Sequence, residues 1–474
     1  MKKIIIPIST ILVLAFGSCK KYTDITPKGA LLVENAQDFY DLVSMPNRGY
    51  VPNNFTYLSD NMWMKESNVI GITKNIDIVN FTFDTTENRV NLISSSNLYT
   101  QAYLYINRWN IIISLAGNSK GDNDLKARAI AEAKVLRAFD YFHLINVYAK
   151  AYDANTAATD GGVCIMDKYD LEASPTKGTV QQCYDLIQKD LDEAIPYIQT
   201  NPVDVYHPNL AFAWALKAKV HLFKREIAQA KEAALKALSI KSDLFDMVAY
   251  TAQGGPTVVV VPAANNPEVL SYQYMTGYNE MSFAYQWIIS PELRALYGSN
   301  DARFNLFFNT TNNSLQDAAA GTAYWGVAYT RFFCPTVGMK TPEIYLMLAE
   351  CYAREGDLVN ATKYLNDLRV KRIVGSTATL PVATTVKEAM NTIIDERRKE
   401  LFIGFNRFFD LKRLNLEPEY AKTLTRTFPI VNTTVPKKTY TLPPNSRMYI
   451  IPFPANVLKL NKSLTLNTDE VIPF

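Results

Sequence analysis

The chain has 474 residues, of which 48% are hydrophobic and 20% charged, and its formal net charge is +3. This composition is typical of a globular protein with one large hydrophobic core or two modest ones, and it excludes a mainly disordered chain. A charge balance so close to neutral argues against a nucleic-acid-binding surface as the main function.

The N-terminal segment has the features of an export signal. Two lysines follow Met1, an apolar run covers residues 4–16, and the small residues Gly17 and Ser18 come next. The apolar run is shorter than the roughly 20 residues that span a bilayer. We therefore expect residues 1–18 to be a signal peptide that is removed on export. Loss of its two lysines lowers the formal net charge to +1.

Cys19 follows directly, and small residues before a cysteine resemble the lipobox of bacterial lipoproteins, although Phe16 stands where leucine is usual. In that pattern the thiol is acylated and becomes the mature N-terminus. Each buried acyl methylene contributes about 0.8 kcal/mol, so several chains would anchor the protein without a spanning helix. We expect lipidation at Cys19 and a polar leash over residues 19–34. The alternative is an ordinary signal peptide with an incidental cysteine.

Two long helices are predicted in the first half of the chain. Residues 98–113 place Leu98, Tyr105 and Trp109 at helical spacing on one side, which indicates an amphipathic helix. Residues 124–148 are apolar nearly all round in their second half, as expected for a helix that is covered on most faces.

Two helical hairpins follow, at residues 209–238 and 342–372. When the two are aligned, Ala218 matches Ala349 and Ala230 matches Ala361, and such small residues let antiparallel helices approach closely. The pattern is typical of tetratricopeptide-like helix pairs, which must stack to bury their apolar faces. The predicted fold is mainly α, with these pairs forming a frame.

Residues 241–340 form a loop-rich insertion with short β-prone runs, and residues 47–97 have the same irregular character. We expect a single domain over residues 35–474, with a helical half at 35–240 and another at 341–474. Loops on rigid scaffolds usually carry the binding residues.

Cysteines and histidines give no metal or redox motif. Cys164, Cys183, Cys334 and Cys351 show neither CxxC nor a framework spacing, so buried free thiols are expected, with a disulfide as the alternative after export. The three histidines form no metal-ligand pattern, and no nucleotide-binding glycine loop or nucleophile motif occurs. We predict no cofactor and no metal.

Four stretches together resemble the SusD/RagB family. They are "CKKYTDITPKG" at the mature start, "AEAKVLRAFDYFHLINVYA" at 131–149, "ERRKELFIGFNRFFDLKRLN" at 396–415 and "YIIPFPANVLKLNKSLTLN" at 449–467. The last two are similar to the family's E-R-R-x-E-L plus R-[WF]-F-D-L-x-R segment and to its closing segment. Asn456 and Val457 replace the usual closing glutamate, and Lys462 stands where proline is common.

The resemblance implies a non-catalytic, lipid-anchored protein of the outer membrane that faces outward. Such a protein would bind an oligosaccharide and deliver it to a partner SusC-like TonB-dependent transporter. Two alternatives remain, namely a peptide-binding member of the same family and a secreted glycan-cleaving enzyme. The dense charge at residues 395–400 is expected to be a salt-bridged helix that docks the C-terminal tail, rather than a catalytic pair of Glu396 and Glu400.

A glycan site needs flat aromatic surfaces ringed by polar groups. In the family's glycan binders, an arc of aromatic side chains contacts the ligand, and it comes from one N-terminal region and two regions of the middle insertion. The resemblance implies aromatic residues of the same regions in this chain, without a residue-by-residue match. The two tryptophans in strong helical patterns, Trp109 and Trp214, are expected in the core. The candidate ligand-binding residues are Trp63, Tyr278, Tyr285, Trp287, Tyr324 and Trp325.

Overall fold

The computed structural model describes residues 33–50, 54–63, 69, 75–170, 172, 175–259, 261, 265–273, 288–309, 324–325, 336, 338–402, 404–429 and 437–474. The proposed signal peptide, Cys19 and most of the leash lie outside these residues. The division of residues 35–474 into two helical halves and an insertion stays a prediction. No described helix is both long and apolar enough to cross a membrane.

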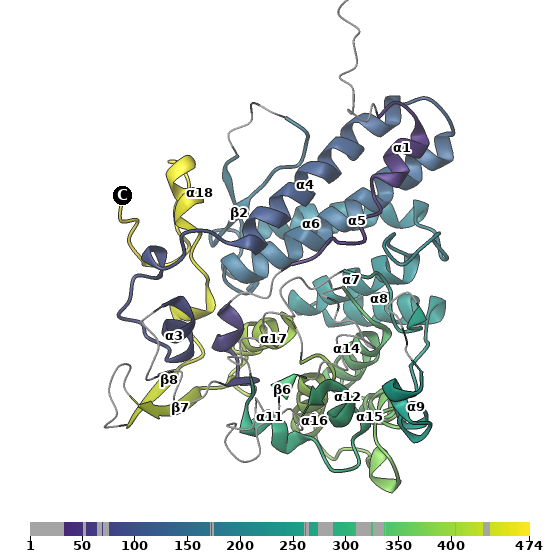
Figure 1. The fold of residues 1–474 in the computed structure, drawn as a ribbon, viewed down its shortest axis with the longest axis vertical. Helices are drawn as coiled ribbons and strands as arrows, with labels where there is room; N and C mark the ends of the chain where they lie inside the picture. Colours follow the sequence, from purple (N-terminus) through teal and green to yellow (C-terminus); the bar gives the residue numbers. More distant parts are fainter. Residues whose placement is uncertain are drawn as a thin grey trace, which may run out of the picture.

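A frame of packed helices makes up most of the fold (Figure 1). Its N-terminal helices are α1 (Ala36–Asp41), α4 (Asn97–Leu115), α5 (Asn123–Tyr148), α6 (Val180–Ala194), α7 (Leu210–Phe223) and α8 (Ile227–Ile240). Its C-terminal helices are α14 (Thr341–Arg354), α15 (Leu358–Arg369), α16 (Val386–Glu400) and α17 (Asn406–Leu414). Helix α5 packs between α4 and α6, and α14 packs against α8, α15 and α16. The predicted mainly α fold of stacked helix pairs is confirmed.

Local sequence signals explain where these helices begin and end. The side chain of Ser96 caps α4, and that of Asn209 caps α7. Between α14 and α15 the chain turns at Gly356, whose φ of +82° lies in the left-handed region that favours glycine. Asp357 then caps α15 by accepting from the backbone N–H of Asn360. The predicted turn of the second hairpin is therefore confirmed.

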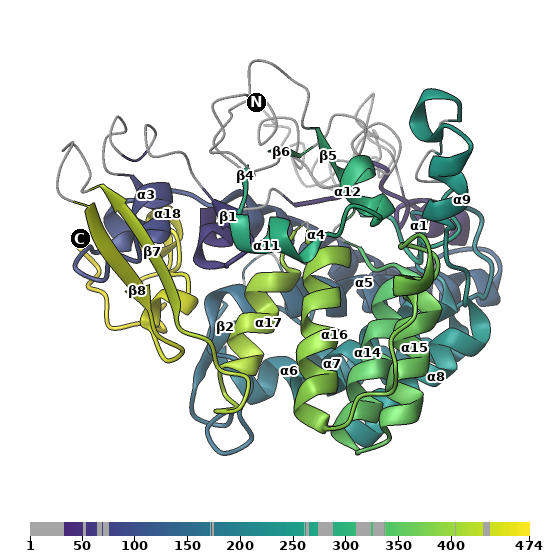
Figure 2. The same ribbon diagram turned by 90° about the horizontal axis from the view of Figure 1, so that it is seen from below.

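The remaining strands and the last helix flank the frame. The hairpin of β7 (Leu424–Pro429) and β8 (Lys437–Leu442) stands at one side of it, and β2 (Gly161–Cys164) pairs with β3 (Lys177–Thr179). After β8 the chain forms a short turn of 3₁₀ helix and then α18 (Ala455–Leu460). Figure 2 shows the β7–β8 hairpin beside the upright helices α17, α16 and α14.

The tracts expected to be irregular contain short helices that periodicity missed. They are α3 (Ile76–Phe81), α9 (Met247–Ala252), α11 (Pro291–Leu296) and α12 (Ala302–Phe307). Each has six residues, which is too short for an apolar stripe to repeat. The predicted loop-rich character with short strands is confirmed, and these four short helices add to it; helices this short depend on tertiary packing for their stability.

A small sheet joins the two irregular tracts. Its strand order is β1 (Met62–Trp63), β4 (Ile288–Ile289), β6 (Tyr324–Trp325) and β5 (Phe308–Asn309). Trp63 pairs with Ile288, Ile288 pairs with Tyr324, and Tyr324 pairs with Asn309. The strand from the N-terminal tract thus forms one edge of a sheet whose other three strands come from the insertion. Figure 2 shows β1 and β4 beside α11.

The two tryptophans expected in the core have different environments. Trp109 is fully buried, and its indole N–H donates to Asp140 Oδ2 at 2.7 Å. Trp214 is only half-buried, with the ammonium groups of Lys217 and Lys236 over its ring, so its assignment to the core is corrected. Its helix α7 packs against α8, whose Lys236 lies over the Trp214 ring.

The cysteines agree with the predicted buried thiols. Cys164, Cys183 and Cys351 are buried and free, and Cys334 lies outside the described residues. Burial raises the pKa of the Cys183 thiol to about 12, which keeps it protonated and unreactive.

Candidate functional site

A cavity of about 290 Å³ lies beside the small sheet, between β1, the start of α11 and the start of β7. Its walls come from three distant parts of the chain. They include Trp63 from β1, Glu292 from α11, and Lys422 and Thr425 before and within β7. Pockets from about 300 Å³ upward commonly hold small ligands, so this cavity suits one or two sugar units of a longer, partly exposed chain.

Trp63 supplies the aromatic wall. Its ring is half-buried and packs against Phe428 at a centroid distance of 5.0 Å and against Phe81 at 6.0 Å. The same residue lines the cavity. Packing and ligand contact are therefore compatible for Trp63, because the two phenylalanines fix the ring that borders the open space.

Asp60 anchors the floor of the cavity. Its carboxylate accepts two bonds from Arg407, Nε to Oδ1 at 2.6 Å and Nη2 to Oδ2 at 2.8 Å. Lys422 Nζ lies 2.8 Å from Oδ2 and Arg398 Nη2 lies 3.4 Å from it. Burial alone would raise the pKa of the Asp60 carboxyl, but these three cations outweigh burial and hold the pKa well below its usual value. The Asp60 carboxylate is therefore ionised, and both of its oxygens are engaged in ion pairs with these cations.

Arg426 on β7 links the N-terminal tract that contains Asp60 and Trp63 to the β7–β8 hairpin. Its Nη1 donates to the carbonyl oxygens of Tyr57 and Phe81 at 2.7 and 2.8 Å. Its Nη2 donates to those of Ser59 and Met62 at 2.6 and 3.2 Å. Burial lowers the pKa of this guanidinium to about 9, because carbonyl oxygens and the rings of Phe81 and Phe83 compensate its charge less than a paired carboxylate would. Three of its four bonds fix the backbone immediately before Trp63, and the fourth holds the end of α3.

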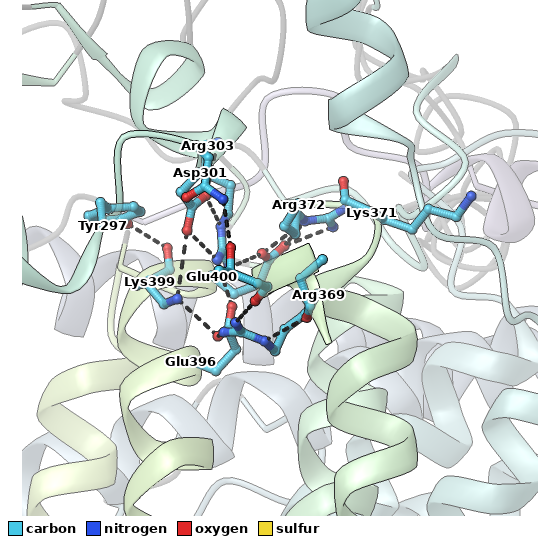
Figure 3. Close-up of polar contacts among 12 residues, drawn as sticks. Tyr297, Asp301, Arg303, Arg369, Lys371, Arg372, Glu396, Lys399 and Glu400 are labelled. Atoms are coloured by element: carbon cyan, nitrogen blue, oxygen red, sulfur yellow. Dashed lines mark hydrogen bonds and ion pairs between the residues drawn. The ribbon is translucent and has the colours of Figure 1, made fainter. Parts of the chain in front are cut away.

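A second buried network docks the insertion onto the frame (Figure 3). Arg303 follows Asp301 at the start of α12, and its Nη1 donates to Glu400 Oε2 at 3.0 Å. Arg372 donates to both oxygens of Glu400 and also pairs with Glu268. Both arginines are fully buried. One glutamate at the end of α16 thus joins two guanidinium groups from distant segments.

Glu396 belongs to the same network. Arg369 Nη1 lies 2.6 Å from its Oε2, Lys399 Nζ lies 2.9 Å from the same oxygen, and Arg303 Nη2 lies 2.6 Å from Oε1. Burial raises the pKa of the Glu396 carboxyl, but these cations outweigh it and lower the pKa well below its usual value. A general acid needs a pKa near the working pH, so the geometry is that of a structural clamp.

The dense charge of α16 therefore forms ion pairs, as expected, but its docking partner differs from the prediction. Glu396 and Glu400 hold segments around Asp301 and Glu268 in the insertion, and Arg398 holds Asp60. Arg397 pairs with Asp410 on α17. The predicted docking of the C-terminal tail by this segment is wrong. Sequence spacing could not show it, because Asp60, Asp301 and Glu268 lie far from α16 along the chain.

The structure describes only some of the ligand-binding residues predicted from the sequence. The backbone of Tyr324 and Trp325 forms β6, two strands away from Trp63 in the same sheet. Tyr278, Tyr285 and Trp287 lie outside the described residues. Glu292, Lys422 and Thr425 line the cavity and were missed, because nothing in "SPELRAL" or "YAKTLTRTF" distinguishes them from ordinary surface residues.

Two other cavities are larger. One of about 570 Å³ lies among residues 200–206 and 265–270, and one of about 410 Å³ lies between the end of α5, the end of α17 and the turn after β8. Neither contains a tryptophan in its walls. We favour the cavity beside the sheet because it combines an aromatic wall with accessible polar groups. Among the described residues, no group of three or more His, Cys, Asp or Glu side chains could hold a metal ion.

Comparisons with known proteins agree with this architecture. A family model described as starch-binding and associating with the outer membrane, for SusD-like proteins, matches residues 34–222. The model of the SusD family itself matches residues 321–469. The chain belongs to the SusD/RagB family. A SusD-like protein of Formosa agariphila is 23% identical over 428 residues, which is 78% of this chain and 80% of that protein.

Solved structures share the fold of this SusD/RagB protein at low sequence identity. A SusD superfamily protein of Bacteroides thetaiotaomicron has a TM-score of 0.70 and 20% identity, covering 91% of this chain and 98% of its own. A putative sugar binding protein of Bacteroides vulgatus has a TM-score of 0.69 and 19% identity, covering 93% and 100%. A laminarin-binding SusD-like protein has a TM-score of 0.62 and 18% identity, covering 92% and 100%.

Proposed function

We propose that this protein binds an oligosaccharide at the small sheet and the adjoining cavity. The observation that carries the proposal is the pairing of β1, β4 and β6, which gathers the N-terminal tract of Trp63 and two tracts of the insertion at one place. A half-buried indole beside accessible polar groups suits the apolar face and the hydroxyl rim of a pyranose. The names of relatives that bind sugar or laminarin support the same ligand class.

The proposal extends to location and partner. Cys19 carries the lipid anchor that holds the protein at the outer membrane, facing outward, and a SusC-like TonB-dependent transporter receives the oligosaccharide. Family membership and the description of the matched model as associating with the outer membrane support the location. The protein acts by binding and release, without cleaving its ligand. Replacing Cys19 with Ala should move the protein from the membrane fraction to the soluble fraction, and unchanged membrane association would contradict the anchor.

Titration calorimetry against a panel of oligosaccharides tests the binding function. Trp63→Ala should weaken binding of the recognised sugar at least about tenfold, since losing an aromatic platform removes a contact of a few kcal/mol. Trp214→Ala is the matched control, because Trp214 is also half-buried but lies on α7. Binding of a peptide but of no sugar would favour the peptide alternative, and release of shorter sugars would favour the enzyme.

A further inference from the structure

Two charged side chains stand at the accessible edge of the cavity. Of its charged wall residues, Asp60 and Arg426 are buried, whereas the side chain of Glu292 is 51% exposed and that of Lys422 is 37% exposed. A ligand in the cavity can therefore reach Glu292 and Lys422 without displacing the buried ion pairs beneath them.

Their present contacts leave hydrogen-bonding capacity on both groups. Glu292 Oε1 accepts from Arg398 Nη1 at 2.7 Å and from Lys422 Nζ. Its other oxygen, Oε2, has no hydrogen bond within the part of the chain that the structure describes. Lys422 Nζ also donates to Asp60 Oδ2 at 2.8 Å. An ammonium group has three N–H donors, so one remains.

Both exposed groups already have partners of opposite charge. Lys422 faces two carboxylates, those of Asp60 and Glu292, and Glu292 faces Arg398 as well as Lys422. An incoming anion would compete with both carboxylates for Lys422 and would lie beside the free, negatively charged oxygen of Glu292. Like charges at such short range repel, particularly where the surroundings are partly desolvated.

We propose that Glu292 and Lys422 bind adjacent hydroxyl groups and that the ligand at this site is an uncharged oligosaccharide. One hydroxyl donates to Glu292 Oε2 and its neighbour accepts from Lys422, while the ring packs on Trp63. A carboxylate or sulfate group offers acceptors only and cannot replace the hydroxyl at Glu292, and such a group elsewhere on the same sugar unit would be repelled by the Glu292 carboxylate. This inference rests on the proposed function and specifies the chemical class of sugar.

The test compares neutral and acidic hexasaccharides on the mature chain by titration calorimetry. The neutral set is maltohexaose, laminarihexaose, cellohexaose, xylohexaose and mannohexaose, and the acidic set is the hexamers of galacturonate, alginate and chondroitin sulfate. At least one neutral sugar should bind about tenfold or more tightly than every acidic one, the size expected for a hydrogen bond to a charged group.

Glu292→Gln sharpens this test because the amide keeps one oxygen for Arg398 and Lys422 but replaces the free oxygen with a donor. The variant should bind the neutral sugar about tenfold more weakly. The ratio of neutral to acidic affinity should therefore fall. A purely structural role of Glu292 would weaken both classes alike. Glu388→Gln, an exposed glutamate in the first turn of α16, is the matched control and should leave both affinities unchanged.

The outcomes separate this inference from the proposed function. Tighter binding of an acidic than of every neutral sugar would overturn the inference and leave glycan binding standing. An unchanged ratio of neutral to acidic affinity in Glu292→Gln would do the same. If no sugar of either set bound to the folded protein, the proposed function and the inference would both fail.

Discussion

Arg407 holds Asp60 through two parallel hydrogen bonds of 2.6 and 2.8 Å, although the two residues are 347 positions apart in the sequence. The guanidinium comes from α17 in the C-terminal half, and the carboxylate precedes β1 in the N-terminal tract. This pair therefore fixes the strand that carries Trp63 to the helical frame, and Lys422 extends the same anchor to the cavity.

Replacing Asp60 with Asn should destabilise the fold by about 3–5 kcal/mol, because it leaves Arg407 and Arg398 buried with too little negative charge. The pKa of Asp60 is lower in the folded chain than its ordinary value of 3.8, so its ionised form stabilises the fold. That contribution is fully present above about pH 4 and is lost as the pH falls further, through the folded pKa.

Urea unfolding at about pH 7, pH 5 and pH 3.5 measures this dependence. The stability difference between the native protein and Asp60→Asn should be constant at the two higher values and should shrink at the lowest. Asp395→Asn is the control. The Asp395 side chain is 50% exposed and lies 3.8 Å from Arg398, so removing its charge should destabilise the fold much less than Asp60→Asn does. A difference that stays constant down to the lowest pH would contradict the assigned role of Asp60.

Much of the helical frame could be predicted from the sequence because its signals are local. The apolar spacing of Leu98, Tyr105 and Trp109 predicts α4, and Gly356 predicts the turn between α14 and α15. Six-residue helices such as α11 have capping signals, here Ser290 at the N-cap followed by Pro291, but no repeating apolar stripe. Helices this short depend on tertiary packing for their stability.

The candidate site could be predicted only by region. Trp63 stands out in the sequence as an aromatic residue in an irregular tract, whereas Glu292 and Lys422 have no local signature. What makes them part of one cavity is the convergence of β1, α11 and β7 on Asp60 and Arg398. Contacts of such long range depend on the tertiary fold and not on spacing along the chain.

Replacing Glu400 with Gln should cost about 3–5 kcal/mol of stability, because both Arg303 and Arg372 would keep a buried charge that one amide cannot balance. Glu388 on the same helix is exposed and accepts from Thr384 at the helix start, so Glu388→Gln should lower the unfolding midpoint much less. Chemical denaturation of both variants measures the difference. Equal midpoints for the two would show that the network of Figure 3 does not hold the insertion in place.

Replacing Gly356 with Ala should destabilise the protein by about 1–2 kcal/mol, because a side chain is disfavoured at a φ of +82°. No atom lies within 4 Å of the added methyl group, so the backbone conformation alone causes the cost. Gly117 also has open space around it, but it is not in the left-handed region, so Gly117→Ala should be neutral or slightly stabilising. Thermal unfolding compares the two, and an equal effect would contradict the backbone explanation.

Amide hydrogen exchange with and without the recognised oligosaccharide tests the central claim most directly, because it locates the bound ligand along the chain. Saturating sugar should slow exchange in residues 54–63 and 422–426, and it should leave exchange unchanged around the 410 Å³ cavity at residues 444–450. Protection at residues 444–450 with none at residues 54–63 would contradict the placement of the glycan site beside Trp63.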